Sequence, residues 1–74
     1  MKILQEIKIK TEFIKLTQLL KFCGEVQSGG EAKVLVLENL VKLNNEICTT
    51  PGKKVYPGDV VEFNQKTWKI VDEN

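Results

Sequence analysis

The 74-residue sequence contains no arginine and no histidine, and all eleven of its basic residues are lysine. The guanidinium group of arginine is planar and can donate two parallel hydrogen bonds to the edge of a guanine base. Its absence argues against base-specific recognition of nucleic acid. The absence of imidazole excludes histidine-dependent triads and histidine-ligated metal sites. The lysines nearly balance ten acidic residues, and the net charge of +1 argues weakly against a nucleic-acid binder unless the lysines gather on one face.

Cysteine is also scarce. Cys23 and Cys48 lie far apart in the sequence, and neither belongs to a CxxC pair. We interpret them as small buried thiols in a reducing cytoplasm, with a disulfide or a redox role as the alternative.

The carboxylates are scattered, no nucleophile stands beside a base, and the Walker and GxGxxG glycine signatures are missing. The sequence therefore predicts neither an enzyme nor a protein that binds a metal or a cofactor.

Long apolar runs are missing as well. No segment approaches the roughly 20 apolar residues that span a bilayer, and the N-terminus lacks the apolar core of a signal peptide. We therefore expect a cytoplasmic protein without a membrane partner. The length leaves room for one domain, residues 1–74, with a free energy of unfolding on the order of 5 kcal/mol. Such a domain offers a binding surface rather than a deep cavity.

The sequence begins with a strand and a short helix. Apolar and charged residues alternate from Glu6 to Phe13, the pattern of a half-buried strand, and we place this strand at residues 3–13. The period then lengthens, because one helical stripe is formed by Leu16, Leu19, Leu20 and Cys23. Thr17 is the predicted N-cap of this helix, and Gly24 is its predicted left-handed C-terminal residue.

A second helix follows a capping-box pattern. Ser28 and Glu31 stand three residues apart, the spacing at which each side chain binds the other's backbone N–H group, so Gly29 and Gly30 become the first two helical positions. Asn39 is the predicted stop. The predicted inward stripe consists of Ala32, Leu35 and Val36, closed by Leu40. Val34 and Leu37 add apolar surface beyond this stripe, so we expect the helix to be covered on two sides.

The remainder of the chain reads as strands and turns. Residues 41–43 and 46–48 form a predicted hairpin through Asn44-Asn45, and residues 49–54 form a loop. Pro57-Gly58 suits a type II turn before the last two strands, residues 60–63 and 67–71. Trp68, in step with Ile70, is a predicted core residue. The fold class is α+β, with two short helices packed on a small, mostly antiparallel sheet.

The start of the second helix is a candidate anion site. A helix N-terminus carries unpaired N–H groups and about half a positive charge, and it therefore attracts phosphate. Glycine at positions 29 and 30 removes the side chains that would hold a phosphate away, and Lys33 follows one turn later. Taken alone, the same residues also fit a cap and a turn without any ligand.

The order of these features resembles a known family. The matching pieces run from Leu16 to Phe63: Leu19-Leu20-Lys21, Gly24, Ser28-x-x-Glu31-Ala32-Lys33, Val41-Lys42-Leu43-Asn44 and Val55-x-x-Gly58-Asp59-Val60-Val61. Together they resemble the RNA-binding domain named after ribosomal small-subunit protein four, the S-four domain or alpha-L RNA-binding motif. The segment from Ser28 to Lys33 is similar to that of free-standing bacterial members of about this length. Residues 16–63 would be the core motif, and the strands at 3–13 and 67–71 would flank it.

The resemblance implies a non-catalytic protein that binds structured RNA, in particular ribosomal RNA or an assembling ribosomal subunit. It implies an RNA-binding face that includes Lys21, Ser28, Gly29, Lys33, Asn44, Lys53 and Lys54. We add Gly30 from the helix tip, and Lys15 and Tyr56 because they neighbour matched positions. The sequence departs from the family at Lys33, where many members have arginine, and at Asn39 and Asn45, where glycine is frequent. A lysine keeps the charge of an arginine but not its forked contact with phosphate.

Without arginine, selectivity is expected to come from RNA shape rather than from base edges. We expect a monomer with no small-molecule substrate. The alternative is a protein-interaction adaptor that does not bind RNA, which the low net charge and the extra apolar residues Val34 and Leu37 favour.

Overall fold

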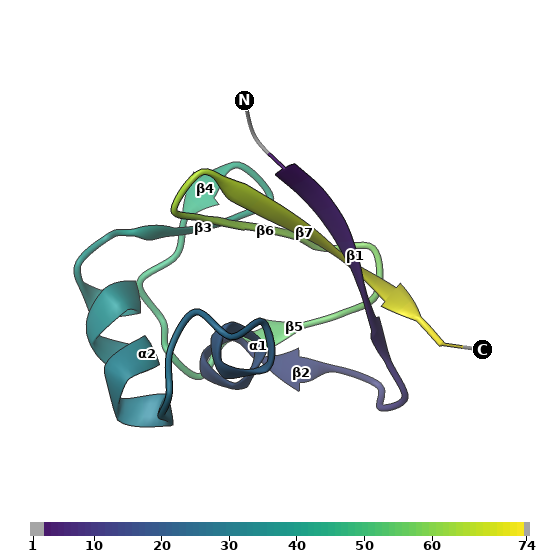
Figure 1. The fold of residues 1–74 in the computed structure, drawn as a ribbon, viewed down its shortest axis with the longest axis horizontal. Coiled ribbons are helices and arrows are strands. Elements are labelled where there is room, and N and C mark those ends of the chain that lie inside the picture. Colours follow the sequence, from purple (N-terminus) through teal and green to yellow (C-terminus); the bar gives the residue numbers. More distant parts are fainter. Residues whose placement is uncertain (1–2, 74) are drawn as a thin grey trace.

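The computed structural model describes residues 3–73 and contains two sheets and two helices. Five strands form the larger sheet in the order β1-β7-β6-β3-β4, and β2 and β5 form a separate two-stranded sheet (Figure 1). In chain order the elements are β1 (Ile3–Ile9), β2 (Ile14–Lys15), α1 (Leu16–Phe22), α2 (Gly29–Leu37), β3 (Val41–Leu43), β4 (Glu46–Ile47), β5 (Lys54–Val55), β6 (Val60–Phe63) and β7 (Lys66–Asp72). The predicted α+β class is confirmed.

The larger sheet is mostly antiparallel, as predicted, but its first and last strands run in parallel. β1 pairs with β7 from Ile3↔Lys66 to Ile9↔Asp72, while β7–β6, β6–β3 and β3–β4 are antiparallel. The predicted extension of the first strand to Phe13 is wrong. The strand ends at Ile9, and the Thr11 hydroxyl donates a 2.7 Å hydrogen bond to the Phe13 carbonyl, which closes a local turn instead.

The two-stranded sheet determines where α1 begins. Ile14 lies opposite Val55 and Lys15 opposite Lys54, so part of the predicted loop 49–54 is in fact a strand. The Leu16 N–H donates to the Lys53 carbonyl at 2.9 Å, so a distant segment satisfies one of the donors that a helix N-terminus leaves unpaired. The prediction of Thr17 as N-cap is therefore wrong: Lys15 occupies the N-cap position, with no side-chain cap.

Both helices end as predicted, in left-handed residues. Gly24 has φ +80° and Asn39 has φ 63°. After α1, the Gly24 N–H donates to the Lys21 carbonyl at 3.0 Å and the Glu25 N–H to the Leu20 carbonyl at 3.1 Å, the paired bonds of a Schellman motif. These bonds satisfy the last carbonyls of α1 and turn the chain toward α2.

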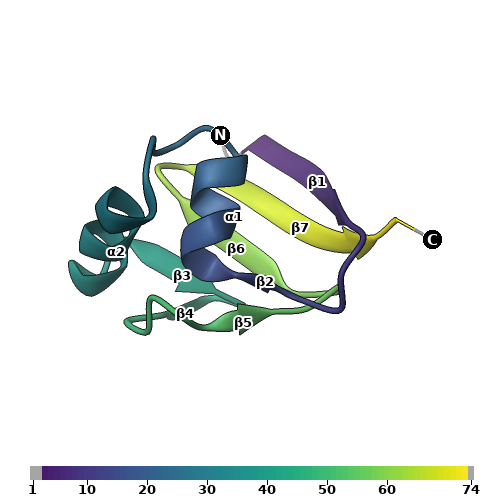
Figure 2. The same cartoon turned by 90° about the horizontal axis from the view of Figure 1, so that it is seen from below.

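The helices cover one face of the larger sheet and enclose the core with it (Figures 1 and 2). Trp68 is a core residue, as predicted, and its indole N–H donates to the Gln5 side chain at 3.1 Å. The buried apolar residues are Ile9, Leu16, Leu19, Leu20, Val26, Ala32, Val36, Val41, Val55, Val61, Trp68 and Ile70. The Lys66 ammonium also forms a 3.0 Å ion pair with Glu25, which ties the segment between the helices to β7.

The prediction that α2 is covered on two sides is wrong. Val34 and Leu37 are about half exposed. Of the predicted inward stripe, Ala32 and Val36 are buried, but the prediction that Leu40 closes the stripe is wrong, because Leu40 is also about half exposed. α2 packs against α1, and within residues 3–73 no further element covers its other side. Apolar residues therefore occur around most of this helix without forming a second buried face.

Two predicted turns between strands are present and use residues with positive φ. Asn44 and Asn45 both have positive φ, 53° and 70°, as a two-residue hairpin turn requires. Gly58 has φ 98°, and the Asp59 N–H donates to the Tyr56 carbonyl at 3.0 Å, so the predicted type II turn is confirmed.

Candidate nucleic-acid interface

The N-terminus of α2 presents free backbone donors to solvent. The Ser28 hydroxyl accepts the Glu31 N–H at 3.3 Å, and the Glu31 carboxylate accepts the Gln27 N–H at 3.4 Å. The first half of the predicted capping box is confirmed, and the second is corrected, because Glu31 binds the amide of Gln27 rather than that of Ser28. Within residues 3–73, the N–H groups of Gly29 and Gly30 have no acceptor. Two donors therefore point away from the helix at its positive end.

Internal packing does not require glycine at either position. Gly29 and Gly30 do not have positive φ, and a Cβ atom added at either one would meet no atom within 4 Å. Both residues are exposed. Two residues with poor helix propensity thus begin a helix where the space above them is open, which keeps the free donors accessible.

A second group of exposed lysines lies at the start of α1. Lys15 and Lys54 are directly opposite each other in the β2–β5 pair, and Lys53 precedes Lys54. In the described part of the chain, none of the three forms an ion pair with a carboxylate. Like charges opposite each other in a sheet are destabilising by a few tenths of a kcal/mol or more. The fold therefore holds these positive charges together without neutralising them.

Two aromatic rings accompany this lysine group. The Lys54 ammonium lies 4.9 Å from the centroid of the Phe13 ring, which in turn lies 5.8 Å from the Tyr56 ring in a tilted arrangement. Tyr56 is exposed to 42%. The cation–π contact fixes the position of the Lys54 side chain while its charge stays accessible.

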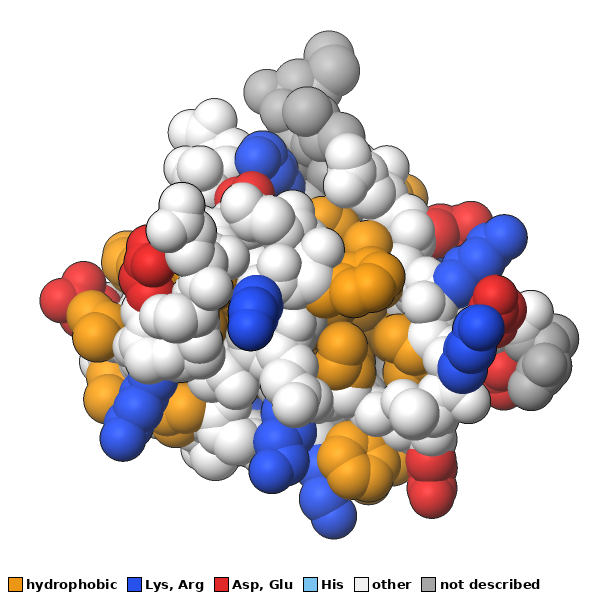
Figure 3. All heavy atoms as spheres, turned by 60° about the horizontal axis from the view of Figure 1, so that its bottom comes forward, with side chains coloured by type: hydrophobic (Ala, Val, Ile, Leu, Met, Phe, Trp, Pro, Cys, Tyr) orange, Lys and Arg blue, Asp and Glu red, His pale blue; other side chains and the backbone are white. Residues whose placement is uncertain are grey.

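Most of the predicted residues belong to elements on the side of the molecule away from the larger sheet, whereas Asn44 lies in the turn between β3 and β4 of that sheet. The start of α2 and the strand β2 are on this side in Figure 1, and α1 crosses it in Figure 2. Figure 3 looks onto this side obliquely: lysine side chains are spread over it, hydrophobic side chains gather near its middle, and acidic side chains lie mostly toward its margins. Lys21 on α1 and Lys33 on α2 are both exposed.

Asn44 is already engaged within the protein. Its side-chain oxygen accepts the Val60 N–H at 2.9 Å, and its amide nitrogen donates to Asp59 at 3.2 Å. Asp59 also accepts the Tyr56 N–H at 2.8 Å, so Asn44 fastens the hairpin turn to the turn before β6. The RNA contact predicted for Asn44 stays a prediction, and the structure gives this side chain a structural role as well.

Replacing Asn44 with alanine is expected to lower the free energy of unfolding by about 1–2 kcal/mol, because two hydrogen bonds and a residue suited to positive φ are lost. Urea denaturation of the variant measures this change. An unchanged unfolding midpoint would contradict the structural role.

The two cysteines are free and only partly buried. Burial and, to a lesser extent, the neighbouring Glu25 carboxylate raise the pKa of the Cys23 thiol to about 11, against a smaller lowering by Lys66. The thiol is therefore protonated at neutral pH and is a poor nucleophile. The alternative of a disulfide between the two residues does not hold in this structure.

Sequence reasoning missed two residues on this side of the molecule, Phe13 and Phe22. The sequence predicts Phe13 as the end of the first strand, whereas β1 ends at Ile9, and Phe22 falls between the stripe positions of α1. Phe22 is 66% exposed and borders a shallow hollow with Ile14, Gln18 and Lys21. Exposure of an aromatic side chain at this position depends on which elements flank α1, which the periodicity of one helix does not reveal.

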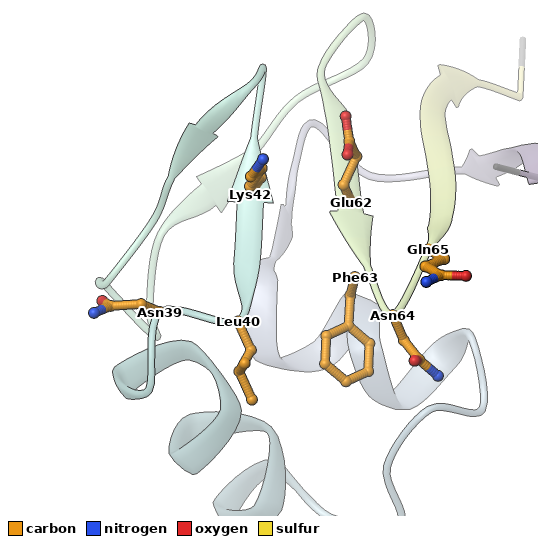
Figure 4. Close-up of a pocket in the computed structure, with 7 residues that line it drawn as sticks. All are labelled: Asn39, Leu40, Lys42, Glu62, Phe63, Asn64 and Gln65. Atoms are coloured by element: carbon orange, nitrogen blue, oxygen red, sulfur yellow. The ribbon is translucent and has the colours of Figure 1, made fainter. Parts of the chain in front are cut away.

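Another hollow contains none of the predicted site residues. It is lined by Asn39, Leu40, Lys42, Glu62, Phe63, Asn64 and Gln65, and Figure 4 shows the Leu40 and Phe63 side chains pointing the same way beside the end of α2.

Across residues 3–73, no group of three histidine, cysteine or acidic side chains is arranged to hold a metal ion. No helix in the described part of the chain is long and apolar enough to cross a membrane.

Comparison with known proteins identifies the class. A family model described as S4 domain matches residues 7–71, and the chain belongs to this family, the S-four domain of RNA-binding proteins. A relative with the name probable ribosome maturation protein RlbA, from Bacillus subtilis (strain 168), is 48% identical over 57 residues, which cover 77% of this chain and 80% of that protein. The resemblance inferred from the ordered motifs is therefore confirmed.

Proposed function

We propose that residues 1–74 act as one non-catalytic RNA-binding domain that recognises structured RNA, in particular ribosomal RNA in an assembling subunit. The core motif is residues 16–63. The support comes from membership of the S4 domain family and from the similarity to a protein named for ribosome maturation. We further propose that the domain works as a monomer in the cytoplasm.

The observation that carries the proposal is the open N-terminus of α2, where Gly29 and Gly30 expose unpaired N–H groups and an exposed Lys33 follows one turn later. A phosphate oxygen bound there would meet backbone donors, the positive end of the helix and an ammonium group together. Glu31, which would repel the phosphate, has its carboxylate directed to the Gln27 amide.

The exposed lysines at the start of α1 extend the proposed surface. Lys15, Lys53 and Lys54 supply three charges free of ion pairs in the described structure, and Lys21 supplies one from α1. Contacts of this kind position a protein on the sugar-phosphate chain without reading base sequence. A rigid arrangement of charges on two helices and a strand pair suits the backbone geometry of an RNA junction or bulge.

Salt dependence tests the ionic character of this binding. With about four phosphate contacts, the logarithm of the association constant should fall with the logarithm of salt concentration with a slope of roughly −3 to −4. Fluorescence anisotropy with a labelled RNA hairpin between 50 and 300 mM salt measures the slope. An affinity independent of salt would contradict the proposal.

Replacing Gly29 and Gly30 together with alanine is expected to separate binding from folding. The space at both positions is open, so the free energy of unfolding should stay unchanged or rise by up to about 1 kcal/mol. The two methyl groups hinder approach to the backbone donors, so RNA affinity should fall by about ten-fold. Thermal unfolding and hairpin binding of the same variant give both values, and undiminished affinity would exclude the helix tip as a contact.

A second candidate is the protein-interaction adaptor. The exposed Val34, Leu37 and Leu40 favour it, since three half-exposed apolar residues on and just after one helix form a surface that a partner protein could cover. Replacing Leu37 with serine separates the two functions. If the proposal is correct, this variant should bind RNA as tightly as the wild type. If the protein is instead an adaptor, the variant should no longer bind its partner protein, and the wild type should not bind RNA.

A further inference from the structure

The hollow beside Phe22 lies on the outward side of α1. Lys21 and Phe22 follow Gln18 by three and four residues, so both side chains neighbour that of Gln18 on the helix surface, and Ile14 of β2 completes the lining. The buried side of the same helix is formed by Leu16, Leu19 and Leu20. The three helical residues of the lining therefore belong to the solvent side of α1, while Ile14 of β2 is partly buried and also packs against the core.

Phe22 has no evident packing role. Its side chain is 66% exposed, the same fraction as that of Leu4, and these are the two most exposed large apolar side chains in the described structure. A single exposed apolar residue is ordinary. Phe22, however, borders a hollow that is also lined by Ile14 and Lys21. An aliphatic side chain, an aromatic ring and an ammonium group therefore line the same hollow.

The hollow shares Lys21 with the proposed RNA-binding face. Its Ile14 directly precedes Lys15 in β2. No acidic residue lines the hollow. Figure 3 shows hydrophobic side chains in the middle of this face with lysine side chains nearby.

We infer that the hollow binds one unpaired nucleobase of the RNA. The Phe22 ring stacks on the base, the Gln18 amide donates to and accepts from the base edge, and the Lys21 ammonium binds the adjoining phosphate. A paired base inside an A-form helix is out of reach of such a hollow, so the target contains an extruded nucleotide next to a helical segment. The acid-free lining and the lysines around it favour a nucleotide over an apolar peptide.

This inference rests on the proposed RNA binding and adds the kind of element that is recognised. It is tested with three RNA hairpins that share one stem: fully paired, with a single bulged adenosine, and with an abasic residue at the bulge. At low salt an RNA-binding protein binds all three through phosphate contacts, so the comparison isolates the base. The bulged hairpin is expected to bind roughly ten-fold tighter than the abasic one.

The variant Phe22→Ala is expected to bind all three hairpins equally, and Phe22→Trp is expected to restore the preference for the bulged adenosine. Leu4→Ala is the matched control, because Leu4 is equally exposed but lies on the opposite face of the larger sheet from Trp68 and the core. It should keep the full preference. Circular dichroism verifies that each variant is folded.

The outcomes separate the two claims. The inference is overturned if the wild type binds the bulged and abasic hairpins equally, or if Phe22→Ala keeps the preference for the bulged hairpin. RNA binding itself would then stand, and the hollow would have another occupant, such as a peptide. Absence of wild-type binding to every hairpin at low salt overturns the proposed function itself, and the inference with it.

Discussion

Replacing Lys33, Lys53 and Lys54 together with glutamate is expected to lower RNA affinity by roughly 100-fold or more. Each change removes an attractive phosphate contact and adds a repelling charge, and the three positions span the start of α2 and the strand pair beside α1. The fold should stay intact, because the three ammonium groups form no ion pair in the described structure and only Lys54 loses a contact, the one with the Phe13 ring, worth about 0.5–1 kcal/mol. Lys54→Glu also places a carboxylate opposite Lys15, where two like charges now face each other.

A control with the same net charge distinguishes a binding face from general attraction. Lys8, Lys42 and Lys69 are exposed and lie on the outer face of the larger sheet, since their strand neighbours Ile9, Val41 and Ile70 are buried on the inner face. Replacing these three with glutamate should lower affinity only by the weaker effect of net charge. Equal losses in the two triple variants, measured by anisotropy with the same hairpin, would show that no particular face binds RNA.

Replacing Trp68 with alanine is expected to unfold most of the protein at room temperature. Trp68 is 1% exposed, and deleting a buried tryptophan side chain costs about 3–5 kcal/mol. A domain of 74 residues has a free energy of unfolding of that same order. The substitution also removes the indole donor that binds Gln5.

Trp68→Phe is a milder substitution at the same position. It keeps an aromatic ring in the core but removes the hydrogen bond to Gln5, so a smaller loss of stability is expected. Urea denaturation followed by circular dichroism compares the two variants with the wild type. A cooperative transition at the wild-type midpoint in Trp68→Ala would contradict the central position of this side chain in the core.

The sequence predicts best those features that depend on near neighbours. Gly24 and Asn39 end their helices because their backbones tolerate positive φ, and Asn44-Asn45 forms a tight hairpin for the same reason. Ser28 caps α2 through an atom only three residues away. In each case the feature depends on residues within one helical turn of each other, so residue type and spacing are enough to predict it.

Features that depend on distant segments were mispredicted. The N–H group of Leu16 is satisfied by the carbonyl of Lys53, 37 positions later, and nothing near Thr17 indicates this. The two-residue strands β2 and β5 are too short to show a period of their own. The exposure of Leu37 and Leu40 depends on the absence of any covering element in the described chain, which the pattern of α2 alone does not reveal.

The same distinction applies to the proposed interface. The glycines and Lys33 at the start of α2 were recognisable from local sequence, because capping chemistry is local. The opposition of Lys15 and Lys54 and the contact of Lys54 with Phe13 arise from a strand pair between distant parts of the chain. The resemblance to the family implies Lys53 and Lys54 as contacts, and the hydrogen bond from the Leu16 N–H to the Lys53 carbonyl accounts for their proximity to α1.

The central claim is that an RNA phosphate docks on the N-terminus of α2, and backbone amide NMR tests it most directly. Titration of the ¹⁵N-labelled protein with the fully paired hairpin at low salt is predicted to shift the amide signals of Gly29, Gly30 and Lys33 far more than those of the outer sheet residues. If these signals stay in place while RNA binds, or if the shifts cluster around Leu37 and Leu40, RNA contacts another surface and the account is wrong.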